Sequence, residues 1–356
     1  MMKRLEDIFR GKKILVTGGT GCIGSEIVRS ILKYKPEVVR IFSNDENGTF
    51  QMMQETDDST TKMMHEIPNK RFLIGDIRDK ERVMLAMEDI DIVYHAAALK
   101  HVPLCEYNPF EAIKTNVLGT RNVIESALAC GVDKVISIST DKAVNPANTM
   151  GATKLLAEKL IIDANEGKGT KETIFSSVRF GNVSFSRGSV IPLFEEQIRL
   201  KKMITITNPE MTRFIMSLSN TIDLVFQATL LAKGGEIFVL KMPVIKLEDL
   251  VDVIIEKYAE KYNYRKGSIE KKIIGLRPGE KMFEELMTVT EAAFAFETDT
   301  MLIIPPQIEM PSISYTISDY PNVRPCSFIG YSSKDIKPIS KEEIEHLLFT
   351  DRLPIG

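Results

Sequence analysis

The strongest candidates for chemistry in this sequence follow one short apolar run. Val135–Ser139 predicts a strand, Thr140, Asp141 and Lys142 come directly after it, and Lys154 follows in the segment MGATK. These residue types supply a hydrogen-bond donor, an acid and a possible base. Functional groups of open α/β sheets gather beyond the carboxyl ends of strands, so this position favours catalysis over an ordinary turn carrying a surface salt pair.

A second candidate site opens the chain. The run KKILVTG predicts a strand, and it passes through TGGTGCIG into a predicted helix. Glycines at three-residue intervals, Gly18, Gly21 and Gly24, allow a sharp turn and a close approach of the backbone to a pyrophosphate, which the helix N-terminus would then bind. This pattern at the first strand-to-helix junction predicts a dinucleotide site.

The end of the second predicted strand, Val38–Ser43, bears on the choice of dinucleotide. An acid there would favour NAD, but the strand ends in Ser43, followed by Asn44 and Asp45. Serine removes the repulsion of an extra phosphate, although no arginine stands by to bind one, so we expect NADP with NAD as the alternative. Asp76 and Ile77, after the run FLIGDI, lie where a carboxylate reads an adenine edge or simply caps a helix.

The elements that position these residues alternate regularly. Between Lys12 and Thr140, short β-branched runs are separated by amphipathic stretches such as Ser25–Lys35, which predicts an α/β fold with a Rossmann-like, doubly wound parallel sheet. We expect a dinucleotide-binding domain over residues 1–180, to which residues 217–243 return with a strand at Glu236–Leu240. Residues 181–216 and 244–330 would form a smaller substrate-binding domain, and residues 331–356 a C-terminal tail.

Composition limits the other possibilities. Lys and Arg number 46 against 49 Asp and Glu, a net charge of −3, which argues against nucleic acid as a partner. No apolar run approaches the roughly 18 residues that span a bilayer, and the start of the chain lacks a signal-peptide core. The four cysteines form no C-x-x-C pair and no metal-ligand spacing. We therefore expect a cytoplasmic protein with no metal site and no membrane span.

Eight motifs in a fixed order carry a family resemblance. They are TGGTGCIG, HAAALKHVPLCEYNPFEAIKTNVLGT, SISTDKAVNP, MGATK, RFGNV, SRGSVIPLF, MTRF and LRPGEK. The chain resembles the extended short-chain dehydrogenases/reductases of the polysaccharide-biosynthesis branch, the UDP-N-acetylglucosamine 4,6-dehydratases, in their soluble short form. The resemblance implies a tightly bound, recycled nicotinamide dinucleotide. Hydride leaves C4 of the sugar, water is eliminated across C5 and C6, and the hydride returns to C6.

The resemblance also implies a role for particular residues. Thr140 would position the sugar, Lys142 and Asp141 would serve as C5 base and C6 acid, and Lys154 would hold the nicotinamide ribose. For Lys142 to accept a proton near neutrality, its pKa must fall. Lys100 lies beside His101, which we leave out of the catalytic set. The implied cofactor contacts add Thr20, Cys22, Ile23 and Ala97, and the implied substrate contacts are Lys100, Met150, Asn182, Val190, Arg213, Arg277 and Glu280.

Met150 is a departure from the wider superfamily, where a tyrosine usually stands four residues before the lysine. A thioether cannot serve as a base, so C4 deprotonation passes to Lys142, Asp141 or a bound water. The expected reaction converts UDP-N-acetylglucosamine for deoxy-amino sugar synthesis, in a homo-oligomer. The alternatives are a 4-epimerase, a 5-epimerising dehydratase and a dinucleotide-binding regulator without catalysis.

Overall fold

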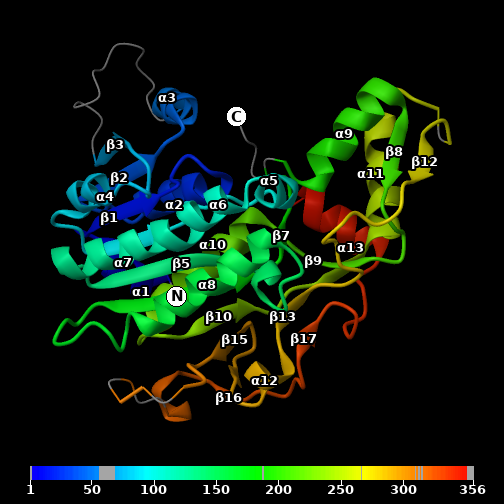
Figure 1. Cartoon of the computed structure of the whole chain (residues 1–356). Coiled ribbons are helices and arrows are strands. Elements are labelled where there is room, and N and C mark those ends of the chain that lie inside the picture. The colour runs from blue at the N-terminus through cyan, green and yellow to red at the C-terminus, as the bar shows by residue number, and fades with distance from the viewer. Residues whose placement is uncertain are drawn as a thin grey trace.

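A ten-stranded sheet forms the centre of the computed structural model, which describes residues 2–55, 69–186, 188–265, 267–308, 310–311, 313 and 316–350 (Figure 1). Its strand order is β16-β14-β15-β10-β6-β5-β4-β1-β2-β3. The parallel strands are β1 (Lys13–Thr17), β2 (Val38–Ser43), β3 (Lys70–Ile74), β4 (Ile92–His95), β5 (Lys134–Thr140), β6 (Ile174–Phe180) and β10 (Ile237–Leu240). The order reverses at β1, between β2 and β4, where doubly wound sheets bind ligands. The expected α/β class is confirmed.

Helices cover both faces of this sheet, so its strands are apolar on both sides. In β1, Ile14 and Val16 pack into one core cluster and Leu15 into another on the opposite face. The helices of the Rossmann part are α1 (Met2–Phe9), α2 (Cys22–Leu32), α3 (Glu46–Glu55), α4 (Lys80–Met87), α5 (Val102–Tyr107), α6 (Pro109–Ala112), η2 (Ile113–Leu118), α7 (Gly119–Cys130), α8 (Thr149–Asp163) and α10 (Leu218–Leu231). The helix expected at Ser25–Lys35 starts three residues earlier, directly after the glycine turn.

A smaller lobe lies to one side of the large sheet, on the right in Figure 1. It has its own apolar core around Phe194, Ile204 and Ile254. Its main elements are α9 (Val190–Lys201), β8 (Met203–Ile206), α11 (Leu247–Lys261), β12 (Glu270–Ile273), α13 (Lys341–Glu345) and η5 (His346–Thr350). The short strands β7 (Asn182–Val183), β9 (Thr212–Met216) and β11 (Val244–Lys246) form a sheet, and β13 (Glu285–Met287) pairs with β17 (Tyr331–Ser332).

The boundary between the two parts differs from the expected one. Within the expected substrate domain of residues 244–330, β15 (Met301–Ile304) pairs antiparallel with β10, and β14 (Phe296–Glu297) and β16 (Arg324–Pro325) continue the large sheet. These strands have two to four residues, too few to show a period in the sequence. The short helix α12 (Val289–Ala292) precedes β14, and the turn η4 (Ile317–Asp319) lies between β15 and β16.

The expected C-terminal tail packs into the fold. Ile344 of α13 is fully buried in the core of the smaller lobe, while residues 351–356 of that tail lie outside the described residues. In the part of the chain that the structure describes, no helix is both long and apolar enough to cross a membrane.

Candidate functional site

The glycine turn between β1 and α2 has the geometry of an anion cradle. Gly18 adopts φ +65°, and a Cβ on it would lie 2.7 Å from the Ala97 backbone. A Cβ on Gly24 would lie 2.2 Å from the carbonyl oxygen of Gly18. The N-cap of α2 is Gly21, which has no side chain to accept from the first-turn amides. A helix N-terminus capped by a glycine is suited to binding an anion.

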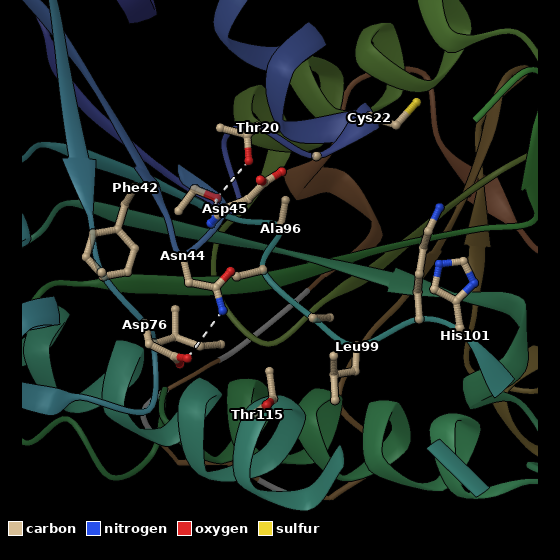
Figure 2. Close-up of a pocket in the computed structure, with 18 of the residues that line it drawn as sticks. Thr20, Cys22, Phe42, Asn44, Asp45, Asp76, Ala96, Leu99, His101 and Thr115 are labelled. Atoms are coloured by element: carbon tan, nitrogen blue, oxygen red, sulfur yellow. Dashed lines mark hydrogen bonds between the residues drawn. The ribbon is translucent and has the colours of Figure 1, made fainter. Parts of the chain in front are cut away.

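A cavity of about 440 Å³ opens beside this cradle (Figure 2). It is lined from both sides of the strand-order reversal, and Lys100 and His101 stand at the end where Gly188 approaches. The expected cofactor and substrate residues that line it are Gly18, Thr20, Gly21, Cys22, Ser43, Asn44, Asp45, Asp76, Ile77, Ala97 and Lys100. Ile23 and Gly24 lie next to it in the first turn of α2.

Two carboxylates occupy the region at the ends of β2 and β3. The hydroxyls of Ser43 and Thr20 form a hydrogen bond at 2.7 Å, and Asn44 Nδ2 donates to Asp76 at 3.3 Å, as the dashed lines in Figure 2 show. Asp45 accepts from the amide of Gly48 at the start of α3. Burial acts to raise the pKa of Asp76, but hydrogen bonds from Arg78 outweigh it and lower the pKa. Asp76 therefore carries a negative charge at neutral pH.

The end of β5 brings an acid and an amine together. Asp141 is buried, and its carboxylate accepts from Thr140 Oγ1 at 2.7 Å and from Lys142 Nζ at 3.0 Å to each oxygen. Burial acts to lower the pKa of Lys142, but Asp141 and Glu284 outweigh it and raise the pKa. The expected fall in this pKa is therefore wrong for the protein as it stands. The physical reason is that two carboxylates stabilise the ammonium.

Of the two candidate catalytic lysines, Lys154 is the one whose pKa falls. It lies on α8, and its Nζ donates to the carbonyl oxygen of Ile138 at 2.7 Å. Burial lowers its pKa to about 8, against the opposing effect of Glu158. His95 is buried between the hydroxyls of Thr17 and Thr120, and burial and the Lys154 charge lower its pKa to about 3, so this imidazole is neutral.

Met150, one turn before Lys154 on α8, is 3% exposed. It packs with Cys105 and Ala112 in a small apolar cluster. The described residues that line the 440 Å³ cavity do not include Met150, Lys154 or any of Thr140, Asp141 and Lys142. The catalytic candidates thus form a group adjacent to α8 and η3 (Asp141–Ala143), separate from the lining of that cavity.

The expected substrate residues converge on a glutamate that the sequence did not single out. Glu284 Oε2 accepts from Asn182 Nδ2 at 2.8 Å, and Glu284 Oε1 lies 3.4 Å from Arg213 Nε and 3.7 Å from Lys142 Nζ. Arg213 also lies 3.8 Å from Glu280. Burial and the Asp141 charge raise the pKa of Glu284 to about 7. No motif in the sequence marks Glu284, which lies in the loop directly before β13.

Two expected contacts remain apart from this cluster. Arg277 is exposed on the loop after β12, where its backbone amide donates to Glu280 Oε2 at 3.2 Å. Val190, at the first turn of α9, is 39% exposed. Among the described residues, no group of three or more His, Cys, Asp or Glu side chains is arranged to hold a metal ion.

Known proteins resemble this chain over most of its length. Residues 14–306 match the family described as polysaccharide biosynthesis protein. The chain is 49% identical, over 98% of both chains, to a Methanocaldococcus jannaschii protein described as an uncharacterized membrane protein. It is 41% identical, over 85% of both chains, to the inverting UDP-N-acetylglucosamine 4,6-dehydratase of Campylobacter jejuni.

Two further relatives extend this comparison. A Rickettsia rickettsii protein named UDP-glucose 4-epimerase is 38% identical, over 96% of this chain and 97% of its own. Among solved structures, Pen from Bacillus thuringiensis superposes with a TM-score of 0.87 at 47% identity, covering 96% of this chain and 98% of that one.

Proposed function

The chain belongs to the polysaccharide biosynthesis protein family, and on that premise we propose that it is a nucleotide-sugar 4,6-dehydratase acting on UDP-N-acetylglucosamine. The observation that carries the proposal is the contact between the Asp141 carboxylate and the Lys142 ammonium at the carboxyl end of β5. A 4,6-dehydration needs an acid and a base side by side, because C5 loses a proton while the C6 hydroxyl gains one.

The glycine cradle and its cavity fit a nicotinamide dinucleotide. A side chain at Gly18 would clash with the Ala97 backbone, and one at Gly24 would clash with the Gly18 carbonyl oxygen, so both glycines are needed for the tight turn that lets the backbone approach a pyrophosphate. A bound dinucleotide would supply the redox chemistry, which is hydride transfer from C4 and back to C6. Ser43 favours NADP, as the sequence suggested, whereas the carboxylates of Asp45 and Asp76 at the cavity favour NAD. Binding titrations of the two dinucleotides decide between them.

The protein's own groups then handle protons and orientation. Thr140, whose hydroxyl donates to Asp141 at 2.7 Å, would orient the C4 oxygen, and Asp141 would give a proton to the departing C6 hydroxyl. Lys142 takes the C5 proton, which C4 oxidation has made acidic. Lys154, with its pKa near 8, adds positive charge beside the nicotinamide ribose. Met150 has no ionisable proton, so the C4 hydroxyl proton passes to Asp141 and leaves with the water.

Charged residues of the smaller lobe would hold the nucleoside diphosphate. Arg213 and Arg277 are the candidate phosphate ligands, and Glu280 is the candidate ribose ligand. Arg213 already donates to the carbonyl oxygens of Thr212 and Lys281 at 2.8 Å each, so substrate binding must share or replace these bonds. Lys100, Asn182 and Val190 complete the proposed substrate wall.

A second candidate is a nucleotide-sugar 4-epimerase, which the name of the Rickettsia relative favours. Purified protein incubated with UDP-N-acetylglucosamine separates the two by mass spectrometry. A dehydratase yields a product lighter by one water, whereas an epimerase changes C4 stereochemistry at constant mass. No product from this or any other nucleotide sugar would leave only a non-catalytic dinucleotide-binding role.

A further inference from the structure

Glu284 is held rigidly beside the acid and amine of the site. Its side chain is 8% exposed. Oε2 accepts from Asn182 Nδ2 at 2.8 Å and from the Phe214 amide at 3.2 Å. Its own backbone is fixed as well, because the amide donates to Ser333 Oγ at 2.9 Å and the carbonyl accepts from the Ser333 amide at 2.8 Å. The remaining oxygen, Oε1, is therefore held facing Lys142 and Arg213.

The charges around Glu284 come from three elements. Turn η3 supplies Asp141 and Lys142, and β9 supplies Arg213. The loop before β13 adds Glu280, 3.8 Å from Arg213, and Lys281, whose Nζ donates a hydrogen bond to the Val144 carbonyl oxygen. Glu285, next in the chain, turns toward Asn145 and Lys281. Lys142 is thus the cation that lies between two buried carboxylates, 3.0 Å from one and 3.7 Å from the other.

This arrangement creates a requirement for the proposed reaction. Before Lys142 can act as the C5 base, its ammonium must give one proton to a neighbouring group. Two carboxylates lie beside it, Asp141 and Glu284. Asp141 by then holds the proton from the C4 hydroxyl, which it passes to the C6 oxygen, so Glu284 is the carboxylate left to accept the Lys142 proton.

Resting on the proposed function, we propose that Glu284 is a positioning residue that takes one proton from the Lys142 ammonium and keeps it while Lys142 accepts the C5 proton. One Nζ–H bond breaks and one Oε1–H bond forms. Lys142 then receives the C5 proton as the C6–O bond breaks and Asp141 protonates the leaving oxygen. Lys142 returns its proton to C5 after C6 has been reduced, and Glu284 re-protonates Lys142 at the end of the cycle. The pKa of Glu284, raised to about 7 by burial and by Asp141, lets it hold a proton at neutral pH.

Glu284→Gln tests this role, with Glu285→Gln as the matched control on the neighbouring residue. The glutamine keeps the acceptor for Asn182 and the size of the side chain but cannot take a proton. We expect kcat at pH 7 to fall about 100-fold with little change in KM, and the deficit to shrink toward pH 9, where solvent can remove the Lys142 proton. Glu284→Asp retains a titrating carboxyl and should recover part of kcat without that pH dependence.

An infrared titration from pH 5 to 9 gives a second reading that needs no turnover. The wild type and Glu285→Gln should show a buried protonated carboxyl that disappears near pH 7, and Glu284→Gln should lack it. Absence of this band from the wild type would overturn the proposal whatever the activity. A Glu284→Gln enzyme with the wild-type pH profile, or one impaired equally at every pH and not improved in Glu284→Asp, would also overturn it.

Two results separate this inference from the proposed function. If the wild type releases water from UDP-N-acetylglucosamine and Glu284→Gln does so equally well, Glu284 alone is misassigned. If the wild type releases none, the dehydratase function fails, and the proton-holding step fails with it. Should Glu284→Gln not fold, Glu284→Asp carries the test, because its shorter carboxyl should lower kcat at constant KM and a wild-type kcat would refute the role.

Discussion

Replacing Gly18 with alanine tests the cradle that the proposed function requires. Gly18 adopts φ +65°, which costs an alanine about 1–2 kcal/mol. The new Cβ would also lie 2.7 Å from the Ala97 backbone, and such overpacking costs about 1–3 kcal/mol more. The free energy of unfolding should therefore fall by about 2–5 kcal/mol in urea. The displaced turn should also lose amide bonds to the pyrophosphate.

A charge-assisted hydrogen bond is worth about 1.5–3 kcal/mol, so the dissociation constant of the dinucleotide should rise at least about tenfold on losing one. Isothermal titration calorimetry measures it. Gly131→Ala is the matched control, because Gly131 has φ +69° but nothing within 4 Å of a built Cβ. Gly131→Ala should lose only the stability that the positive φ costs an alanine, about 1–2 kcal/mol, and should bind dinucleotide like the wild type. Equal stability and equal dinucleotide affinity in the two variants would refute the cradle.

Three further substitutions probe the surrounding site. Lys154→Met removes a buried amine whose pKa is lowered from 10.5 to about 8, so that in the wild type the charged ammonium destabilises the fold at low pH. The stability of the variant relative to the wild type should therefore drop by up to about 3 kcal/mol between pH 7 and 10.5, and a pH-independent difference would contradict this. Arg179→Met removes the partner of the buried Glu158 and the partly buried Glu291, and it should cost about 3–5 kcal/mol in urea unfolding. Arg10→Met, at an exposed pair, should cost under about 1 kcal/mol, and equal losses in the two variants would refute the difference. Met150→Tyr should lose about 1–3 kcal/mol of stability to overpacking of the apolar cluster that it shares with Cys105 and Ala112. Because Met150 does not line the cavity beside the glycine cradle, the variant should still bind dinucleotide, and complete loss of binding would contradict the assignment of that cavity to the dinucleotide.

The sequence predicted the Rossmann part well because its physical pattern is local. Parallel strands covered on both faces appear as continuous apolar runs, so β2 was found at Val38–Ser43 without error. The glycine spacing likewise identified the turn before α2. Strands β14 to β16 were missed because each has only two to four residues, and they join the large sheet through the pairing of β15 with β10, which lies in a distant part of the chain.

The catalytic group was predicted only in part. Adjacency in the sequence placed Asp141 and Lys142 together, and the structure gives their contact. The direction of the Lys142 pKa was wrong because it depends on Glu284, which the fold brings in from the other lobe. A reversal of this kind cannot be read from composition or spacing, since it comes from a tertiary contact between two buried side chains.

The central claim is that hydrogen removed from one carbon of the sugar is returned to another carbon of the same molecule. Incubation with UDP-N-acetylglucosamine carrying deuterium at C4, followed by NMR of the product, tests it most directly. We predict a 4-keto product that holds the deuterium at C6. Deuterium that stays at C4 of an epimerised sugar, or that is lost to solvent, would contradict the account.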